Sequence, residues 1–263
     1  MNKLYTGYGF DETVSYTSKV EQAGFEYPSA PAPQKRNVFC TFKHDGYMPE
    51  APLCQPIFEG VLTKAINFVG DVVLTTDYKP VMPVILNGVA ASVNLNGNKV
   101  LAPVFAESKG QVLKGDSDSY AFWVKEGAEL TIEGEGEVVA QEAVYSMAVW
   151  ANGGKVTIKG GKFYNNGDNS DLIYASNGSQ VEIFGGEFYA NENKGAEGTK
   201  NEHPALNIKD ADRANTSIKV YGGKFYGFDP AKNVSEGPDT NFVAEGYVSV
   251  EVEPNVWEVR KAE

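Results

Sequence analysis

The sequence predicts an all-β protein whose main body is a parallel β-helix, a solenoid of short stacked strands. Three observations predict this fold: a repeat of about 25 residues, apolar residues that alternate with polar ones within each repeat, and a charge column whose sign alternates between repeats. The chain has 263 residues, of which 42% are hydrophobic and 12% aromatic, so it can build a sizeable core and is not of a disordered type.

The repeat is recognised by a Gly-Gly pair in the segments KVTIKGGKFYN, QVEIFGGEFYA and IKVYGGKFYGF. The pairs at Gly160 and Gly185 are 25 residues apart, and the next step, to Gly222, is 37 because Asn191–Glu202 is inserted. A weaker copy, ELTIEGEGEVV, begins at Glu129. The period is too short for a propeller blade and has no helical spacing, so each repeat is interpreted as one turn of strands.

Within each copy, apolar and polar residues alternate as a half-buried strand requires. The residues predicted to point into one continuous core are Leu130, Ile132, Val156, Ile158, Val181, Ile183, Ile218 and Val220. After the glycine turn, a second inward column consists of Val138, Phe163, Phe188 and Phe225, and an outward column consists of Tyr164, Tyr189 and Tyr226.

A column of charged residues precedes the phenylalanine column and reads Glu137, Lys162, Glu187 and Lys224. Stacked at the ~4.8 Å spacing of neighbouring strands, these residues alternate in sign at every step. Opposite charges across a strand pair stabilise by about 0.2–1 kcal/mol each, so the alternation indicates that the four positions lie one above another.

Both ends of the solenoid have predicted boundaries. Strands broken by turn residues begin at Gly70, and apolar residues at helical spacing predict an amphipathic capping helix over 56–68. Such a helix would cover the open end of the stack, whose unpaired edge invites aggregation. At the other end, YVSVEVEPNVWEVR predicts strands around Pro254 that close the last coil.

The helix, GDVVLTTD, VNLNGNKV and the recurrent VTIKGGKFY segments together resemble the right-handed β-helix of the pectate-lyase-like superfamily, over about residues 56 to 260. More narrowly, the chain is similar to β-helices in virion appendages of crAss-like or related gut phages. This resemblance implies a homo-oligomeric virion structural protein without cofactors, made in the host cytoplasm: a head fibre, a capsid decoration protein or a tail appendage. The fold alone carries many functions.

Residues 1–55 differ from the β-helix domain at 56–263. This arm holds five Tyr, four Phe and five Pro without a sustained helix or strand period. Two interpretations are open: the arm packs on its own solenoid, or it docks on capsid or other virion proteins. Aromatic side chains anchor interfaces, so the predicted partner-binding residues are Tyr5, Tyr8, Phe10, Tyr16, Phe25, Tyr27, Phe39, Phe42 and Tyr47.

No pattern of catalytic residues stands out, and the chain is predicted not to be an enzyme. Glu133, Glu135 and Glu137 form the densest acidic group, which is typical of a solvated turn more than of a catalytic pair. The segment 165–171 is rich in oxygen ligands but lacks the EF-hand register, so an ordinary loop is favoured over a Ca²⁺ site. His44 and His203 accompany no nucleophile motif.

One pattern could bind sugars. Trp123, Trp150 and Tyr174 occupy equivalent places on successive repeats, which is typical either of a stacked core or of an exposed ladder for surface glycans. The alternation of apolar and polar residues does not determine which face of the sheet carries these three side chains. The inserted segment Asn191–Glu202 is predicted to be a protruding contact loop. A polysaccharide-degrading tailspike enzyme and a bacterial surface adhesin are the alternative functions.

The net charge and the absence of long basic or apolar runs limit the classes of partner that the chain is expected to bind. The formal net charge of −12 and the lack of a long basic run argue against nucleic acid and anionic membranes as partners. No apolar run is long enough to span a membrane, and the start at Met1 does not resemble a secretion signal. Two cysteines, Cys40 and Cys54, do not make a disulfide framework and are predicted to be reduced.

Overall fold

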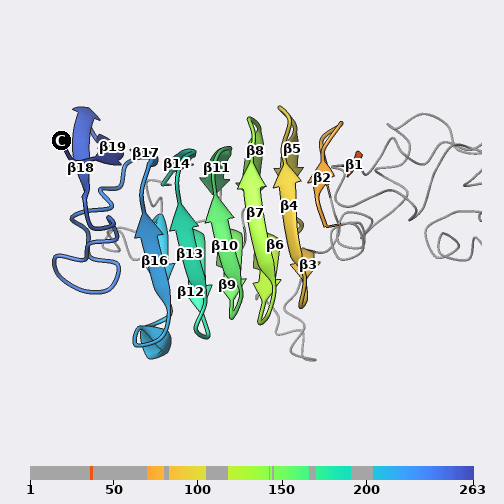
Figure 1. The fold of residues 1–263 in the computed structure, drawn as a ribbon, viewed down its shortest axis with the longest axis horizontal. Coiled ribbons are helices and arrows are strands. Elements are labelled where there is room, and N and C mark those ends of the chain that lie inside the picture. The colour runs from red at the N-terminus through yellow and green to blue at the C-terminus, as the bar shows by residue number, and fades with distance from the viewer. Residues whose placement is uncertain are drawn as a thin grey trace, which may run out of the picture.

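The computed structural model describes residues 36–37, 70–79, 83–104, 118–141, 143, 145–165, 170–190 and 204–263. These residues form three sheets whose strands lie side by side along the length of the molecule (Figure 1). The predicted capping helix at 56–68 lies outside the described residues, as does the arm 1–55 apart from Arg36–Asn37.

Each sheet is a row of strands that come from successive repeats. In spatial order, the first sheet contains β1 (Arg36–Asn37), β2 (Val72–Val73), β4 (Ala90–Asn94), β7 (Glu129–Glu133), β10 (Lys155–Ile158), β13 (Gln180–Ile183) and β16 (Ser217–Val220). The second contains β18 (Tyr247–Glu253), β19 (Val256–Lys261), β17 (Gly223–Tyr226), β14 (Glu187–Tyr189), β11 (Lys162–Asn165), β8 (Glu137–Ala140) and β5 (Lys99–Leu101). The third contains β15 (Leu206–Ile208), β12 (Ser170–Ser176), β9 (Tyr145–Asn152), β6 (Asp118–Lys125) and β3 (Val84–Leu86).

The chain visits the three sheets in a fixed rotation. It passes through β4, β5 and β6 in the first, second and third sheets, and β7, β8 and β9 repeat that order. Each of these strands pairs in parallel with its counterpart in the neighbouring repeat. An all-β structure of stacked parallel strands is therefore confirmed, and its path is compatible with a β-helix.

The predicted alternation is confirmed in the first and second sheets. Val156, Ile158, Val181 and Ile183 are all at most 1% exposed, and they belong to one hydrophobic cluster with inward residues of the other two sheets. In the second sheet, Phe163, Phe188 and Phe225 are fully buried, with ring centroids 5.0 Å and 4.6 Å apart along the column. Like residues stack because equivalent positions of successive repeats pair directly.

The two members of a Gly-Gly pair are required for different reasons. A Cβ on Gly185 would lie 2.8 Å from the carbonyl oxygen of Lys159 in the preceding repeat, so the first glycine allows close stacking of the turns. Gly186 has a φ of +105°, a backbone conformation that side chains other than glycine rarely adopt.

The alternating charge column is confirmed by the strand register. Lys162 lies directly between Glu137 and Glu187, and Glu187 lies next to Lys224. Lys162 Nζ is 3.3 Å from a Glu187 carboxylate oxygen. The column extends one step further than predicted, because Lys99 pairs with Glu137 in register and its Nζ lies 2.7 Å from that carboxylate.

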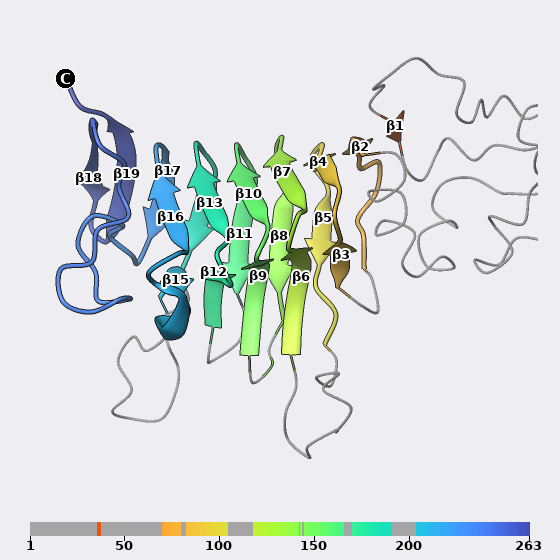
Figure 2. The same ribbon diagram turned by 60° about the horizontal axis from the view of Figure 1, so that its bottom comes forward.

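The carboxyl-terminal strands close the stack as predicted. β18 and β19 form an antiparallel hairpin, and β19 pairs antiparallel with β17, the last parallel strand of the second sheet. The hairpin lies at the end of the molecule farthest from β1 (Figure 2).

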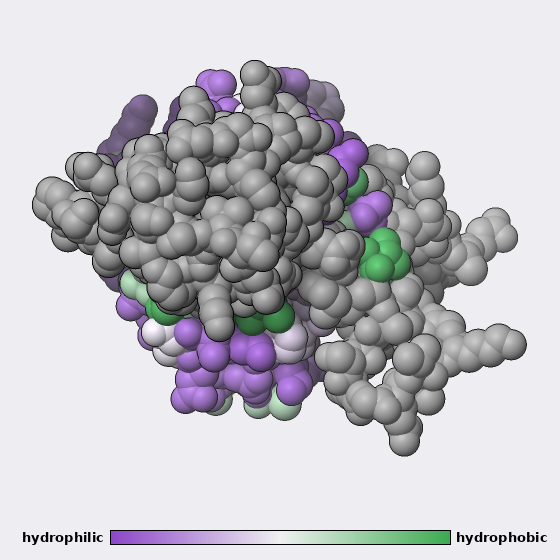
Figure 3. Space-filling model, turned by 90° about the vertical axis from the view of Figure 1, so that its right-hand side faces the viewer, coloured by the Kyte–Doolittle hydropathy of each residue, from purple (hydrophilic) through white to green (hydrophobic). Residues whose placement is uncertain are grey.

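In the view from the side of β1, the described residues that are visible are mostly hydrophilic, with a few hydrophobic spots (Figure 3). Within the described part of the chain, no helix has the length and apolar character needed to cross a membrane.

Candidate functional site

The aromatic column predicted at Trp123, Trp150 and Tyr174 lies on the outer face of the third sheet. The strand register pairs Trp123 with Trp150 and Trp150 with Tyr174. The residues that precede them in the sequence, Phe122, Val149 and Ile173, are fully buried in the core. Since neighbouring residues of a strand point to opposite faces, the three aromatic side chains point away from the core, and each is half-buried.

The two indole rings stack in parallel, with centroids 5.0 Å apart and planes at 1°. Lys125 Nζ lies 4.3 Å from the centroid of the Trp123 ring, within the range of a cation–π interaction. One face of each indole is therefore covered by the other indole.

Tyr120 joins this column although its spacing did not predict it. Its ring makes edge contacts with Trp123 and Trp150, at centroid distances of 5.9 Å and 5.3 Å. The consecutive residues Ala121 and Phe122 are both fully buried, so the inward–outward alternation changes phase there. Tyr120 lies on the side of Trp123 and is itself 3% exposed, packed against the edges of the two indoles. A strictly alternating pattern would place Tyr120 on the other face.

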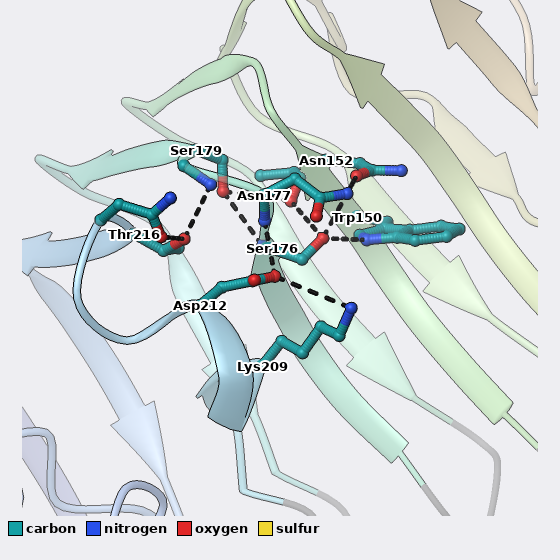
Figure 4. Close-up of polar contacts among 11 residues, drawn as sticks. Trp150, Asn152, Ser176, Asn177, Ser179, Lys209, Asp212 and Thr216 are labelled. Atoms are coloured by element: carbon teal, nitrogen blue, oxygen red, sulfur yellow. Dashed lines mark hydrogen bonds and ion pairs between the residues drawn. The ribbon is translucent and has the colours of Figure 1, made fainter.

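Polar groups beside the column fix the Trp150 ring (Figure 4). The Trp150 indole N–H donates to Ser176 Oγ at 2.9 Å. At the turn that follows Ser176, the backbone N–H of Asn177 donates to Asp212 Oδ2 at 2.8 Å. Lys209 Nζ lies 3.9 Å from the same carboxylate oxygen. The indole is therefore held by a neighbouring repeat, and hydrogen-bonding groups line one side of the aromatic column.

Carboxyl groups surround Tyr174. Burial raises the pKa of its hydroxyl to about 12, and the negative charges of Asp171, Asp212, Asp210 and Glu236 act in the same direction. A ligand at this end of the column would thus meet hydrogen-bond acceptors and negative potential, which favour hydroxyl and amino groups over anionic groups.

Asp171 is the most unusual of these carboxyl groups. It is 7% exposed, and burial raises its pKa to about 7. Its Oδ2 accepts a hydrogen bond from Asn207 Nδ2 at 3.1 Å, whereas its buried Oδ1 has no hydrogen-bond partner among the described residues. The sequence placed Asp171 in a loop rich in oxygen ligands, but the residue lies within β12, and loop residues 166–169 are outside the described ranges.

A second aromatic column lies on the outer face of the second sheet, as predicted. The rings of Tyr164, Tyr189 and Tyr226 stack at 4.5 Å and 4.2 Å between centroids. The hydroxyls of Tyr189 and Tyr226 both donate to the Glu187 carboxylate. The tyrosine column is therefore tied to the charge column through Glu187.

The acidic group predicted at Glu133, Glu135 and Glu137 lies at the end of β7, in the turn that follows it and at the start of β8. Glu137 forms an ion pair with Lys99 in the charge column, and Glu135 is exposed in the turn, as expected of solvated residues. Among the residues that the structure describes, no three His, Cys, Asp or Glu side chains come together to hold a metal ion.

Several predicted residues lie outside the described ranges. They are His44, His203, Cys40, Cys54, the inserted segment Asn191–Glu202, and all nine partner-binding aromatics of the arm, from Tyr5 to Tyr47.

Comparison of the chain with models of known protein families, with curated proteins and with solved structures finds no match. The geometry of the third sheet's outer face is therefore the guide to function.

Proposed function

We propose that this chain is a non-enzymatic structural protein that displays the outer face of its third sheet to glycans. The observation that carries the proposal is the outward, in-register column of Trp123, Trp150 and Tyr174. A sugar chain lying along this face would place its apolar C–H groups against the exposed parts of these aromatic rings. Its hydroxyl groups would meet the acceptors around Tyr174.

The stacked sheets support a scaffold role. A glycosidase needs two carboxyl groups that face the same sugar-binding cleft. Glu137, from the densest acidic group of the sequence, instead forms an ion pair with Lys99 in the charge column. The repeats are tied together by parallel strand pairing, by stacked aromatics and by charge pairs, which makes the body rigid along its length. A rigid body of this kind suits projection of a binding face away from a larger particle.

At the finer level, we propose that residues 56–263 form a right-handed parallel β-helix of the pectate-lyase-like kind. The protein would be a bacteriophage virion appendage: a head fibre, a capsid decoration protein or a tail appendage. The aromatic arm 1–55 would dock on capsid or other virion proteins. The resemblance of the VTIKGGKFY repeats and the tyrosine and phenylalanine content of the arm support this assignment. Mass spectrometry of purified phage particles tests it, and detection of the chain only in host membranes or culture medium would overturn it.

Glycan contact is tested by affinity electrophoresis of the full chain in gels that contain mannan, a neutral β-glucan or anionic alginate. We expect retardation by a neutral polysaccharide and little by alginate, because carboxyl groups surround Tyr174. Trp150→Ala should weaken this binding by about ten-fold, as expected when an aromatic anchor is removed.

The matched control is Phe184→Ala, because Phe184 is 48% exposed and lies just after β13 of the first sheet. This variant should bind as the unmodified chain does. Equal binding by the Trp150 variant would refute contact at this face. Release of shortened sugars from any of the polysaccharides would instead support the degrading enzyme.

A further inference from the structure

β18 lies at the edge of the second sheet and at one end of the molecule. Within the described part of the chain it pairs with β19 alone, and both strands lie at the end of the molecule that carries the carboxyl terminus (Figures 1 and 2). A seven-residue edge strand that exposes main-chain groups is a template for another strand. Its outward valines Val248 and Val252 are each 40% exposed.

The hydrogen-bonding direction of β18 follows from its register with β19. The Ala262 N–H donates to the Gly246 carbonyl at 2.8 Å, and Val248 and Val250 face Arg260 and Glu258 in the same register. Residues of an antiparallel strand alternate in the side toward which their main-chain groups point. Val248 and Val250 therefore bond toward β19, whereas Ser249 and Glu251 direct their main-chain groups away from it.

We propose that β18 is a dimerisation strand, which pairs antiparallel with β18 of a second copy about a twofold axis at Val250. In this register Val250 faces Val250, Val248 faces Val252, and Ser249 faces Glu251. Ser249 and Glu251 are the residues with outward main-chain groups, so they form the hydrogen-bonded pairs. Val250 then occupies a non-hydrogen-bonded pair, in which opposed side chains approach most closely.

The side chains favour this register over its neighbours. A twofold axis at Glu251 would place two carboxylates opposite each other, which destabilises a strand pair. An axis at Ser249 would place Val252 opposite Gly246, beyond the start of β18. With the axis at Val250, the central pairs come from residues 249–251, where the register of β18 with β19 is regular. Val248 then faces Val252, which lies where the register with β19 shifts, and no two like charges are directly opposed. Such self-complementarity is what an isologous interface requires.

The first test is the mass of the full chain in solution, measured by light scattering over a concentration series. We expect a dimer of the 28.5 kDa chain, and loss of that dimer in Val250→Lys, which places two ammonium groups at the axis. Val234→Lys is the control, because Val234 is 65% exposed and lies outside the hairpin. A full chain that is monomeric at every concentration would overturn the proposal. So would a Val250→Lys variant that keeps the dimer, since another surface would then hold the copies together.

A second measurement remains decisive if Val250→Lys fails to fold. Val250→Cys under mild oxidation should give a disulfide-linked dimer through the residue at the axis, with Val234→Cys as the control for the native cysteines and for random cross-linking. A yield of linked dimer no higher than that of Val234→Cys would refute the pairing. The pairing is independent of the function proposed above, because neither test depends on glycan binding.

Discussion

Asp171 shows how one buried residue can set the pH response of the chain. One oxygen of the carboxyl group accepts a hydrogen bond from Asn207, and the other is buried with no partner in the part of the chain that the structure describes. Its ionised form is therefore poorly solvated in the folded state, and its pKa rises to about 7 because the group is buried. An unfolded chain would ionise the same carboxyl near its ordinary value of about 3.9.

The sign of the effect follows from these two pKa values. Between about pH 4 and pH 7 the folded chain binds more protons at Asp171 than the unfolded chain, so the free energy of unfolding falls as pH rises. Between pH 5 and pH 8 this group should lower the free energy of unfolding by roughly 2 to 3 kcal/mol.

Asp171→Asn should remove that part of the pH dependence, because the amide does not ionise. The measurement is urea unfolding of both chains at pH 5 and pH 8. As pH rises, the free energy of unfolding of the variant should increase relative to that of the unmodified chain. If the free energy of unfolding changes with pH in the same way for both chains, ionisation of Asp171 does not destabilise the folded state, and the prediction is wrong.

Two further residue-scale features could not be read from spacing. Tyr120 reaches the outer face because the alternation changes phase at Ala121 and Phe122, which requires knowledge of how the chain bends between sheets. Asp171 looked like part of a solvated loop, but pairing of β12 with β9 draws it into the sheet. Local sequence carries no signal for either placement.

At the scale of the strand, the charge column is the feature most open to test. Glu187 lies between Lys162 and Lys224 in register and also accepts hydrogen bonds from two tyrosines. The pKa of Glu187 is lowered chiefly by the hydrogen bond from Tyr189. The neighbouring Lys162 and the hydrogen bond from Tyr226 act in the same direction.

Glu187→Lys would place three ammonium groups on adjacent strands. The expected loss is about 1–2 kcal/mol in the free energy of unfolding, since the ion pair with Lys162 becomes a repulsive pair and Lys224 is the next residue in register. The measurement is chemical denaturation at about 0.05 M and 1 M NaCl, and the loss should shrink at the higher concentration because salt screens exposed charges. The control is Glu245→Lys, which makes the same charge change at an exposed position. Its free energy of unfolding should stay close to that of the unmodified chain. Equal losses in both variants would mean that net charge, not the column, is responsible.

At the scale of the whole molecule, each repeat is stabilised chiefly by the repeats next to it. The phenylalanine column illustrates this, because Phe188 contacts Phe163 on one side and Phe225 on the other. In such an architecture a core defect weakens its neighbours first.

Phe188→Ala should lower the free energy of unfolding by about 3–5 kcal/mol, since it removes a fully buried ring. Hydrogen exchange should show the largest loss of protection in β10, β11, β13, β14, β16 and β17, with less change in β3 and β4. Phe184→Ala, four residues earlier and 48% exposed, is the matched control and should cost less than about 1 kcal/mol. Uniform loss of protection over all described strands would indicate one cooperative unit instead.

The repeat period, the alternation and the sign-alternating charges were sufficient to predict stacked parallel strands, because every repeat places the same residue type at the same position. Phe163, Phe188 and Phe225 could be assigned to the core, and Lys162 to a place between two glutamates, from spacing alone. The tertiary structure was needed for the features that depend on contacts between repeats. It placed Trp123, Trp150 and Tyr174 on the outer face and buried Asp171. It also left one edge of β18 without a described partner strand. Periodicity specifies which residues stack, but the bends between strands determine which way the stacked residues face.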